Sequence, residues 1–435
     1  MGASAIALLV TLGAVAGQPQ IPQPGTPRAG LPVQAVLSAE PASSPAQEGL
    51  EYQHLKREGP LSIHVLRVDP ARVEIKLVRA LNDGLGRETV SSLARRSGAR
   101  AAVNAGFFTI GGRYDGLPAG VLKVEDRFYS APTKPRGALG WRHDGQALMG
   151  RLLMSWTLAT GSQWIEFDGL NSPRGRQQVI LYSWAFHRTT MTYPGGQEWA
   201  LDRGRIVAQG GNDLAIPVDG YVISAGPEAT RPSLPTGSPV RVDYRFLPQG
   251  QLSRALADKD SDGRWVGPAV IPGQDEKPSN QTSGGQQSGQ PAEGSPTESV
   301  NRDGSKVQTA DAQAWQSMDY IVGGAGLVLQ NGRVTEDYST EQTIETFITN
   351  KHPRTAVGFS AEGSWVVVVV DGRQPELSIG LTLVELGALM KELGCRDALN
   401  LDGGGSTTFV HQGKVMNTPS DFGQERPVSD AIVFK

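Results

Sequence analysis

The chain has 435 residues, with 41 Lys and Arg against 44 Asp and Glu, a net charge of -3 at pH 7. This length allows a sizeable core, whereas the balanced charge provides no long-range positive field to attract nucleic acid or an anionic membrane surface. We therefore expect no nucleic-acid partner. The 54 glycines and 29 prolines favour turns and short strands over long helices.

Cysteine and histidine offer little chemistry. The single cysteine, Cys395, excludes an intramolecular disulfide. It follows a predicted helix end, a position that is more often packed than reactive. The six histidines are scattered, with no pair at helical or finger spacing, so no zinc site is expected.

Residues 1–17 are predicted to be a signal peptide or an N-terminal anchor. An apolar stretch over residues 3–16 ends in Ala14-Val15-Ala16, which matches a signal-peptidase site. The stretch is short for a membrane span, and no Lys or Arg precedes it, so an uncleaved anchor is the alternative. We expect a secreted, periplasmic or envelope protein that contacts the membrane only through such an anchor. Residues 18–50 are a Pro- and Ala-rich linker, predicted to be disordered.

A second polar stretch, at about residues 257–314, is predicted to be a disordered insertion in a continuing domain, with a domain boundary as the alternative. Within it, the sequence DKDSDG places Asp258, Asp260 and Asp262 at calcium-loop spacing. The twelfth position is Ala269 instead of a bidentate Glu, and no helix pattern flanks the loop. A solvated acidic turn is therefore favoured over a calcium site.

The N-terminal α+β segment, residues 51–103, alternates apolar and polar residues over 61–69 and 72–80, which predicts two half-buried strands. A short helix should follow and end at Gly98. Towards the C-terminus, five valines at 366–370 predict a strand buried on both faces. The sequence from Thr382 to Gly394 predicts an amphipathic helix that begins with a capping box, Thr382 and Glu385.

Polar residues follow two of these C-terminal strands. Asp371 directly follows the valine strand, and Asp402 follows a predicted strand at 397–401. If the two strands are parallel neighbours, both carboxylates lie at one edge of a sheet. Three glycines after Asp402 would allow backbone N–H groups to approach an anion, although no Lys follows as in a Walker loop. A hairpin turn into a strand at 406–413 is the simpler alternative.

Several motifs occur together in a fixed order: NAGFF at 104–108, RTAVGFS at 354–360, DGR followed by SIGLTLVEL at 371–386, NLDGGGSTT at 400–408 and ERPVSDA at 425–431. In this order and spacing they resemble the phosphodiester glycosidase family, over residues 104–435 apart from the insertion. The family's namesake activity removes N-acetylglucosamine from a GlcNAc-1-phospho-6-mannose diester, and bacterial members are often labelled exopolysaccharide biosynthesis proteins. The resemblance implies a hydrolase that releases the sugar from a sugar-1-phosphodiester. The expected fold is α+β, a mixed, mostly β-sheet core with a few packed helices in a single large domain.

Cleavage of a sugar from an anomeric phosphate passes through an oxocarbenium-like state and needs a carboxylate beside the sugar or the attacking water. The candidates are Asp402 first, as nucleophile or general base, followed by Asp371 and Glu425. The phosphate leaving group needs electrostatic support more than a strong acid. Candidate phosphate- and substrate-binding groups are Asn104, Arg354, Arg373, Ser406, Thr407 and the N–H groups of Gly403, Gly404 and Gly405.

Each candidate also has a structural interpretation: Asp371 in a turn, Glu425 in an ion pair with Arg426, and Arg354 as a structural arginine. No cofactor is required, although aspartates beside a phosphate would suit Ca²⁺ or Mg²⁺. Two other functions are alternatives. One is a non-catalytic envelope protein that binds phosphorylated glycans, and the other is a metal-dependent phosphodiesterase that breaks the P–O bond.

Overall fold

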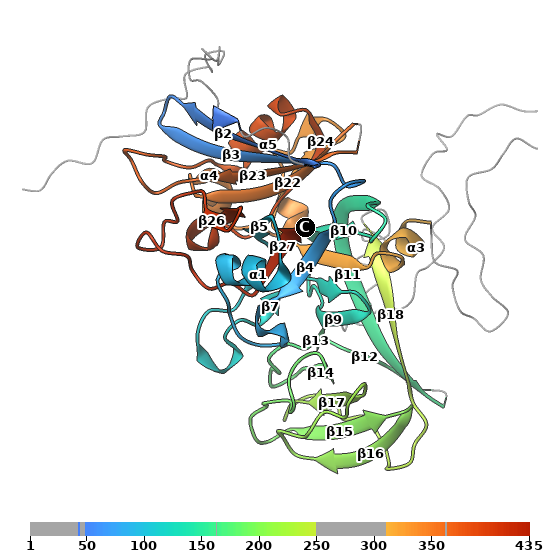
Figure 1. Ribbon diagram of the computed structural model, residues 1–435. Helices are drawn as coiled ribbons and strands as arrows, with labels where there is room; N and C mark the ends of the chain where they lie inside the picture. Colours follow the sequence, from blue (N-terminus) through green and yellow to red (C-terminus); the bar gives the residue numbers. More distant parts are fainter. Residues whose placement is uncertain (1–41, 44–47, 162, 249–309, 362) are drawn as a thin grey trace, which may run out of the picture. The chain divides into compact units, whose positions relative to one another are not determined.

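The computed structural model describes residues 42–43, 48–161, 163–248, 310–361 and 363–435 (Figure 1). Helices are few, and almost every strand pair is antiparallel. The predicted signal peptide, most of the linker and most of the insertion lie outside the described residues, as do Asp258, Asp260 and Asp262. The last residues of the predicted insertion are described and begin helix α3 (Ala310–Gln316). Within the described part of the chain, no helix is long and apolar enough to cross a membrane.

The largest sheet, called sheet A here, has eight strands. Their order is β1 (Ala42–Ser43), β2 (Leu50–Arg57), β3 (Leu61–Val68), β23 (Trp365–Val370), β22 (Arg354–Ser360), β24 (Cys395–Asn400), β20 (Leu327–Gln330) and β21 (Arg333–Val334). Every residue of β23 is buried, as its five valines predicted. The strand predicted at 61–69 is β3, but it is mostly buried because it lies between β2 and β23.

Helix α5 (Leu383–Glu392) packs on one face of sheet A. Val366, Val368 and Val370 contribute to the apolar cluster that contains the buried face of α5. The helix begins with the predicted capping box: Glu385 N donates to Thr382 Oγ1, and Thr382 N donates to Glu385 Oε2. The second helix on this side, α4 (Glu345–Thr349), contacts α5.

Sheet B packs against the other face of sheet A. Its strand order is β26 (Lys414–Val415), β25 (Phe409–His411), β5 (Ala101–Asn104), β27 (Asp430–Phe434) and β4 (Ile75–Arg79). Val367 and Val369 share one apolar cluster with Val103, Ile432 and other side chains of sheet B. Helix α1 (Val90–Ser97) covers the outer face of sheet B (Figure 1). As predicted, Gly98 follows this helix in a left-handed conformation.

Two further sheets share a second core. Sheet E has the order β12 (Gln163–Glu166), β11 (Ala147–Thr160), β10 (Arg136–Trp141), β19 (Tyr320–Gly323), β8 (Leu122–Val124) and β9 (Arg127–Ser130), with β18 (Arg241–Pro248) paired to β11. Sheet F has the order β13 (Gly169–Leu170), β14 (Val179–Ser183), β17 (Tyr221–Ala225), β15 (Gln197–Asp202) and β16 (Arg205–Gly210). The pairing of β10 with β19 joins segments on the two sides of residues 249–309.

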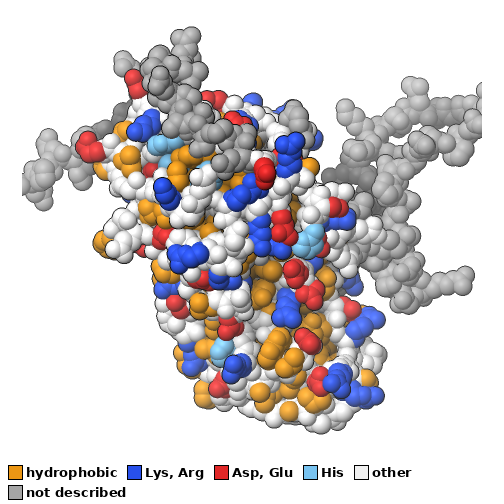
Figure 2. Space-filling view, viewed as in Figure 1, with side chains coloured by type: hydrophobic (Ala, Val, Ile, Leu, Met, Phe, Trp, Pro, Cys, Tyr) orange, Lys and Arg blue, Asp and Glu red, His pale blue; other side chains and the backbone are white. Residues whose placement is uncertain are grey.

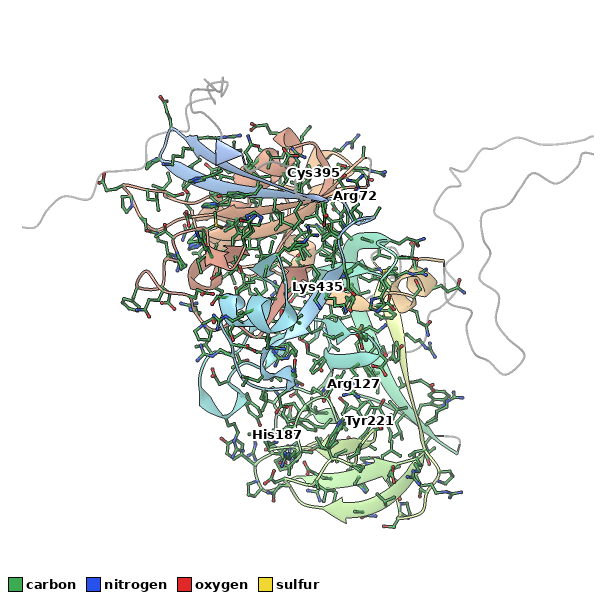
Figure 3. All side chains as sticks on the ribbon, in the orientation of Figure 1. Arg72, Arg127, His187, Tyr221, Cys395 and Lys435 are labelled. Carbon is green, nitrogen blue, oxygen red and sulfur yellow. The ribbon has the colours of Figure 1, made fainter. Side chains whose placement is uncertain are left out.

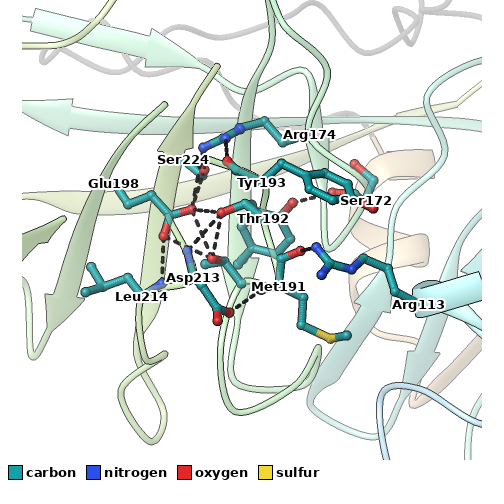
Figure 4. Close-up of polar contacts among 12 residues, drawn as sticks. Arg113, Ser172, Arg174, Met191, Thr192, Tyr193, Glu198, Asp213, Leu214 and Ser224 are labelled. Carbon is teal, nitrogen blue, oxygen red and sulfur yellow. Dashed lines mark hydrogen bonds and ion pairs between the residues drawn. The ribbon is translucent and has the colours of Figure 1, made fainter. Parts of the chain in front are cut away.

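A buried carboxylate supports a hydroxyl-rich loop of sheet F (Figure 4). Glu198 accepts hydrogen bonds from the hydroxyls of Thr190, Thr192 and Ser224 and from the amide of Leu214, at 2.6 to 3.0 Å. Arg174 Nη1 lies 3.7 Å from the same carboxylate. Because the charge is fully buried and fully satisfied, we assign this network to the support of the loop.

Small elements connect the sheets. Strands β6 (Phe107–Phe108) and β7 (Pro118–Ala119) form a two-stranded sheet directly after the end of β5. The short 3-10 helices are η1 (Ala80–Asn82), η2 (Gly112–Tyr114), η3 (Ser339–Glu341) and η4 (Gly404–Ser406). On the face shown in Figure 2, basic and acidic side chains are interspersed, in keeping with the balanced composition.

Two sequence predictions about the C-terminal strands are corrected. Strands β23 and β24 are not neighbours, because β22 lies between them and is antiparallel to both. They therefore run in the same direction, and Asp371 and Asp402 still follow at one edge of sheet A. The second correction concerns the hairpin: β24 belongs to sheet A and β25 to sheet B, so the glycine turn after Asp402 carries the chain from one sheet to the other.

Candidate active site

Asp402 lies where β24 leaves sheet A, and the backbone at this position is bonded to the end of β5. Its N–H donates to the carbonyl of Ala105 at 2.9 Å, and its carbonyl accepts from Nδ2 of Asn104 at 2.7 Å. The Oδ1 atom of Asn104 accepts from Thr355 Oγ1 and from the amide of Thr408. Asn104 is fully buried and uses both ends of its amide within the protein. It therefore positions Asp402, and the substrate contact predicted for it stays a prediction.

The Asp402 carboxylate is enclosed by protein although the residue is partly exposed. Burial raises the pKa of Asp402 to about 7, against hydrogen bonds from Ser406 and from the Gly403 amide, which favour the ionised form. The nearby Asp430 also raises this pKa, and Arg426 lowers it. A carboxyl group with a pKa near neutrality can exchange a proton during turnover, as acid–base catalysis requires.

Asp430 is a second carboxylate of the site and was not among the residues predicted to be functional. It begins β27, is fully buried, and accepts from the amide of Gly106 at 2.6 Å and from Ser429 Oγ at 2.5 Å. Burial raises the pKa of Asp430, and Arg79 opposes this shift. Its position in the motif ERPVSDA was the only sign in the sequence, because an aspartate inside an apolar strand gives no periodic pattern.

Each of the three glycines after Asp402 meets a different constraint. A Cβ on Gly403 would lie 2.7 Å from the carbonyl oxygen of Pro353, and Gly404 has a φ of +61°. The Gly403 amide donates to Asp402 Oδ1, and the Gly404 amide donates to the Pro353 carbonyl. Two of the three N–H groups predicted to bind phosphate are thus used inside the protein. The main role of the turn is therefore to position Asp402, and only the Gly405 amide is left of the three N–H groups predicted to bind an anion.

Two guanidinium groups lie against this turn. A Cβ on Gly404 would be 3.0 Å from Nη2 of Arg373, and a Cβ on Gly405 would be 2.3 Å from Nη2 of Arg426. Arg373 is exposed and was predicted as a phosphate ligand. Arg426 was predicted only as an ion-pair partner of Glu425, but its Nε donates to Asp421 instead, at 2.8 Å. Both guanidinium groups therefore lie against the turn that follows Asp402, and Arg426 is close enough to Asp402 to lower its pKa.

Arg354, another predicted phosphate ligand, has a structural environment. It is fully buried, its Nε donates to the carbonyl of Leu381, and its Nη2 donates to those of Phe347 and Asn350. The pKa of Arg354 is lowered to about 10, mainly by burial. These bonds connect β22 to α4 and to the segment before α5, so Arg354 supports the edge of the site. Its Nη1 is buried without a partner among the described residues, and the phosphate contact predicted for Arg354 stays a prediction.

Asp371 is also buried and is held by protein groups on both sides. Its Oδ1 accepts from Asn417 Nδ2 at 3.2 Å and from the amide of Thr418 at 2.9 Å, and its Oδ2 lies 3.4 Å from His64 Nε2. His64 Nδ1 lies 2.8 Å from the hydroxyl of Tyr52. Asp371 therefore fixes the segment at 417–418 next to the glycine turn, a positioning role that differs from the predicted catalytic one.

Glu425, the third predicted catalytic carboxylate, caps a helix. Its Oε2 accepts from the amide of Ser91 in the first turn of α1, at 2.9 Å. A carboxylate is stabilised in this position by the partial positive charge of the helix N-terminus. This contact gives the acidic residue of the motif a structural role, and the catalytic role predicted for it stays a prediction.

The remaining predicted ligands differ in their partners. Ser406 bonds to Asp402, as described above. Thr407 is buried, and its hydroxyl has no partner among the described residues. The described residues contain no group of three or more His, Cys, Asp or Glu that could hold a metal ion. Cys395 is buried at the start of β24 (Figure 3), and burial raises the pKa of its thiol to about 12, which confirms the prediction of a packed cysteine.

With this geometry, comparison with known proteins identifies the C-terminal part of the chain. Residues 279–435 match the phosphodiester glycosidase family. The resemblance inferred from the motifs is confirmed for this segment, whereas the motif at 104–108 lies outside it. Asp371, Arg373, Asp402, Arg426 and Asp430 all lie within the matched segment, and the groups that hold Asp402 and Asp430 on the β5 side lie outside it.

Similar curated proteins cover short parts of the chain. A prophage-derived uncharacterized protein of Bacillus subtilis is 43% identical over 84 residues, which is 19% of this chain and 13% of that protein. The mouse N-acetylglucosamine-1-phosphodiester alpha-N-acetylglucosaminidase is 32% identical over 114 residues, 24% of this chain and 22% of the mouse protein. The chain thus spans less than a quarter of the length of these relatives.

Solved structures show the same fold over most of the chain. A hypothetical protein from Synechocystis has a TM-score of 0.68 at 22% identity, covering 92% of this chain and 64% of that one. A putative exported protein from Burkholderia pseudomallei has a TM-score of 0.62 at 23% identity, covering 86% of this chain and 74% of that one. The fold therefore extends well beyond the segment matched by the family.

Proposed function

We propose that the protein is a hydrolase that releases the sugar from a sugar-1-phosphodiester of the GlcNAc-1-phosphate type. The observation that carries this proposal is the position of Asp402, whose pKa is about 7, beside a glycine turn flanked by Arg373 and Arg426. The match of residues 279–435 to the phosphodiester glycosidase family supports it.

In the proposed reaction, Asp402 is the carboxylate on the sugar side. At neutral pH the Asp402 carboxyl group is ionised in a large share of the protein molecules. In this form it can attack the anomeric carbon or remove a proton from the attacking water. Asp430 is fully buried nearby, and its carboxylate adds to the effect of burial in raising the pKa of Asp402. Only groups of the chain take part, and no cofactor enters the scheme.

Arg373 and Arg426 are the groups on the phosphate side. As the bond to the anomeric carbon breaks, negative charge accumulates on the departing phosphate. Two guanidinium groups beside the glycine turn stabilise that charge and provide planar donors that suit phosphate oxygens. Arg373 lies 3.2 Å from Nδ1 of His352, whose pKa is lowered by burial and by Arg354 and Arg373. A neutral imidazole at this position can orient the guanidinium without repelling it.

We also propose that the substrate lies outside the cytoplasm, in an envelope or extracellular glycan. The apolar N-terminal stretch with its signal-peptidase pattern supports this location. The similar fold of a protein described as a putative exported protein is in keeping with it.

The test is hydrolysis of a GlcNAc-1-phosphate diester in ¹⁸O-labelled water. Cleavage of the sugar C–O bond leaves the phosphate monoester unlabelled, whereas P–O cleavage places ¹⁸O in it. The label is read on the phosphate because the anomeric hydroxyl of a free sugar exchanges with water. We expect an unlabelled phosphate, activity that survives a chelator, and a loss of about 10³-fold or more in kcat for Asp402→Asn.

Three results would overturn the proposal. Labelled phosphate together with inhibition by chelator would indicate a metal-dependent phosphodiesterase. Binding of the diester without any turnover would indicate a phosphoglycan-binding protein. Equal activity of wild type and Asp402→Asn would remove Asp402 from the chemistry.

A further inference from the structure

A buried arginine lies behind the second carboxylate of the site. Arg79 ends β4, and only 3% of its surface is accessible. Strands β4 and β27 are neighbours in sheet B, and their register places Arg79 opposite Asp430 (Figure 1). A guanidinium group out of water is costly unless a negative charge compensates it. Asp430 has the strongest electrostatic effect on Arg79, ahead of Tyr129 and Asp83, and is therefore its counter-ion.

The two charges are connected through Ser429. Arg79 Nη1 donates to the carbonyl and to Oγ of Ser429, the latter at 2.7 Å, and Ser429 Oγ donates to Asp430 Oδ2 at 2.5 Å. A guanidinium can only donate, so it occupies a lone pair of the serine oxygen and leaves the serine proton for the carboxylate. The amide of Gly106 donates to Oδ1 at 2.6 Å. Both oxygens of Asp430 thus face donors, which favours the ionised form.

The other side of the guanidinium is held by two connecting segments. Arg79 Nη2 donates to the carbonyls of Gly84, at 2.6 Å, and Gly116, at 3.0 Å. The group also lies over the ring of Tyr129 in β9, with its central carbon 5.8 Å from the ring centroid. Because these partners come from different parts of the chain, the cation is fixed in one place behind Asp430.

The charges on helix α1 compensate each other. Arg96 of α1 donates to the backbone carbonyl of Arg79, but it is paired with Glu88 at 3.1 Å. Burial raises the pKa of Asp430, and Arg79 is the cation that opposes this effect, together with the hydrogen bonds to the carboxylate.

We propose that Arg79 is a positioning residue of the active site, which acts through Ser429 to keep Asp430 ionised beside Asp402. The proton that is exchanged near neutral pH then belongs to Asp402 alone. This inference rests on the proposed function, because it takes Asp402 as the reacting carboxylate. Arg79 acts on the reaction through Asp430, without contact to the substrate.

This indirect action predicts a pH shift opposite to that of a direct charge effect. Without Arg79, the buried Asp430 takes up a proton and loses the negative charge that raises the pKa of Asp402. Asp402 then ionises more readily, so the acid limb of kcat/KM moves to lower pH. A cation that acts directly on Asp402, such as Arg426, has the reverse effect when it is removed.

The experiment measures kcat/KM against pH for wild type, Arg79→Gln and Arg79→Lys on a GlcNAc-1-phosphate diester. In Arg79→Gln we expect the acid limb to move to lower pH by about half a unit or more. In Arg79→Lys, which keeps the charge, it should stay in place. Arg151→Gln is the matched control, because it removes another buried arginine, paired with Glu341, and should leave the limb in place.

A second variant covers the case in which Arg79→Gln does not fold. Ser429→Ala removes the bridge and keeps both charges, so the limb should move in the same direction by a smaller amount. An acid limb that stays in place or moves to higher pH in Arg79→Gln, or that stays in place in Ser429→Ala, would overturn the inference. An equal shift in Arg79→Lys or in Arg151→Gln would also overturn it, because the charge of Arg79 would then not be the cause.

If wild type hydrolyses no diester, the proposed function fails, and the inference is tested without turnover. Carbon-13 NMR of protein labelled at the aspartate carboxyl carbons follows the titration of Asp402 and Asp430, with Asp402→Asn and Asp430→Asn to assign the signals. In Arg79→Gln we expect the Asp430 titration to move to higher pH and the Asp402 titration to lower pH. An unchanged Asp430 titration would overturn the role of Arg79.

Discussion

At the scale of single residues, the site depends on how the protein changes the proton affinity of one carboxylate. Burial and Asp430 raise the pKa of Asp402, whereas Ser406, Gly403 and Arg426 lower it, and the balance is about 7. An aspartate in water has a pKa near 4 and would be fully ionised at neutral pH. Here the same side chain can change its protonation state near the working pH.

This balance predicts the pH dependence of the reaction. As nucleophile or general base, Asp402 must be ionised, so kcat/KM should fall about tenfold per unit as the pH drops below about 7. Arg426→Gln removes a positive charge that favours the ionised form, so the inflection should move to higher pH in addition to any loss of phosphate binding. A pH profile of kcat/KM for both proteins measures this. An inflection that stays in place in Arg426→Gln, or activity that rises towards acid pH, would contradict it.

At the scale of elements, glycines allow the close contacts that hold the site together. Gly387 of α5 packs on β20, where a Cβ would lie 2.4 Å from the backbone carbonyl oxygen of Val328. Gly405 packs on Arg426, where a Cβ would meet the mobile end of a long side chain. The backbone carbonyl of Val328 cannot move out of the way of a new methyl group, whereas the Arg426 side chain can.

The two alanine variants should therefore behave differently. Gly387→Ala forces α5 away from sheet A and should cost about 1 to 3 kcal/mol of unfolding free energy. Gly405→Ala should displace the Arg426 guanidinium, leave the unfolding free energy nearly unchanged, and raise KM for the diester several-fold. Denaturant unfolding and steady-state kinetics on both variants test the pair. Equal destabilisation of the two proteins would show that Arg426 is held as rigidly as backbone.

The elements also show what the sequence could predict. The valine run, the capping box at Thr382 and the alternation in β3 are local patterns, and the corresponding strands and helix formed where they were expected. The insertion of β22 between β23 and β24 was not predicted, because strand order is set by contacts between distant segments. For the same reason the hydrogen-bond partners of Asp371 and Glu425, Thr418 and Ser91, could not be predicted, because they come from other parts of the chain.

At the scale of the whole molecule, the segment matched by the family does not contain all of the site. Residues 279–435 provide Asp402 and Asp430. The Asp402 backbone, however, is bonded to Asn104 and Ala105, and Asp430 is bonded to Gly106. Strand β3 pairs with β23, and β4 and β5 pair with β27, so the N-terminal strands complete both sheets around the site.

This arrangement predicts that residues 279–435 do not fold when produced alone. Without β3, β4 and β5, strand β23 loses one neighbour and β27 loses both. Apolar side chains of the shared core, such as Val367 and Ile432, would face water. Each Å² of apolar surface exposed costs about 25 cal/mol, and an ordinary domain has only about 5 to 15 kcal/mol of stability to lose. Circular dichroism and denaturant unfolding should show no cooperative transition for this fragment, whereas residues 42–435 should unfold cooperatively and retain full activity. A cooperative, active 279–435 fragment would mean that the family segment builds its site without the β5 contacts to Asp402.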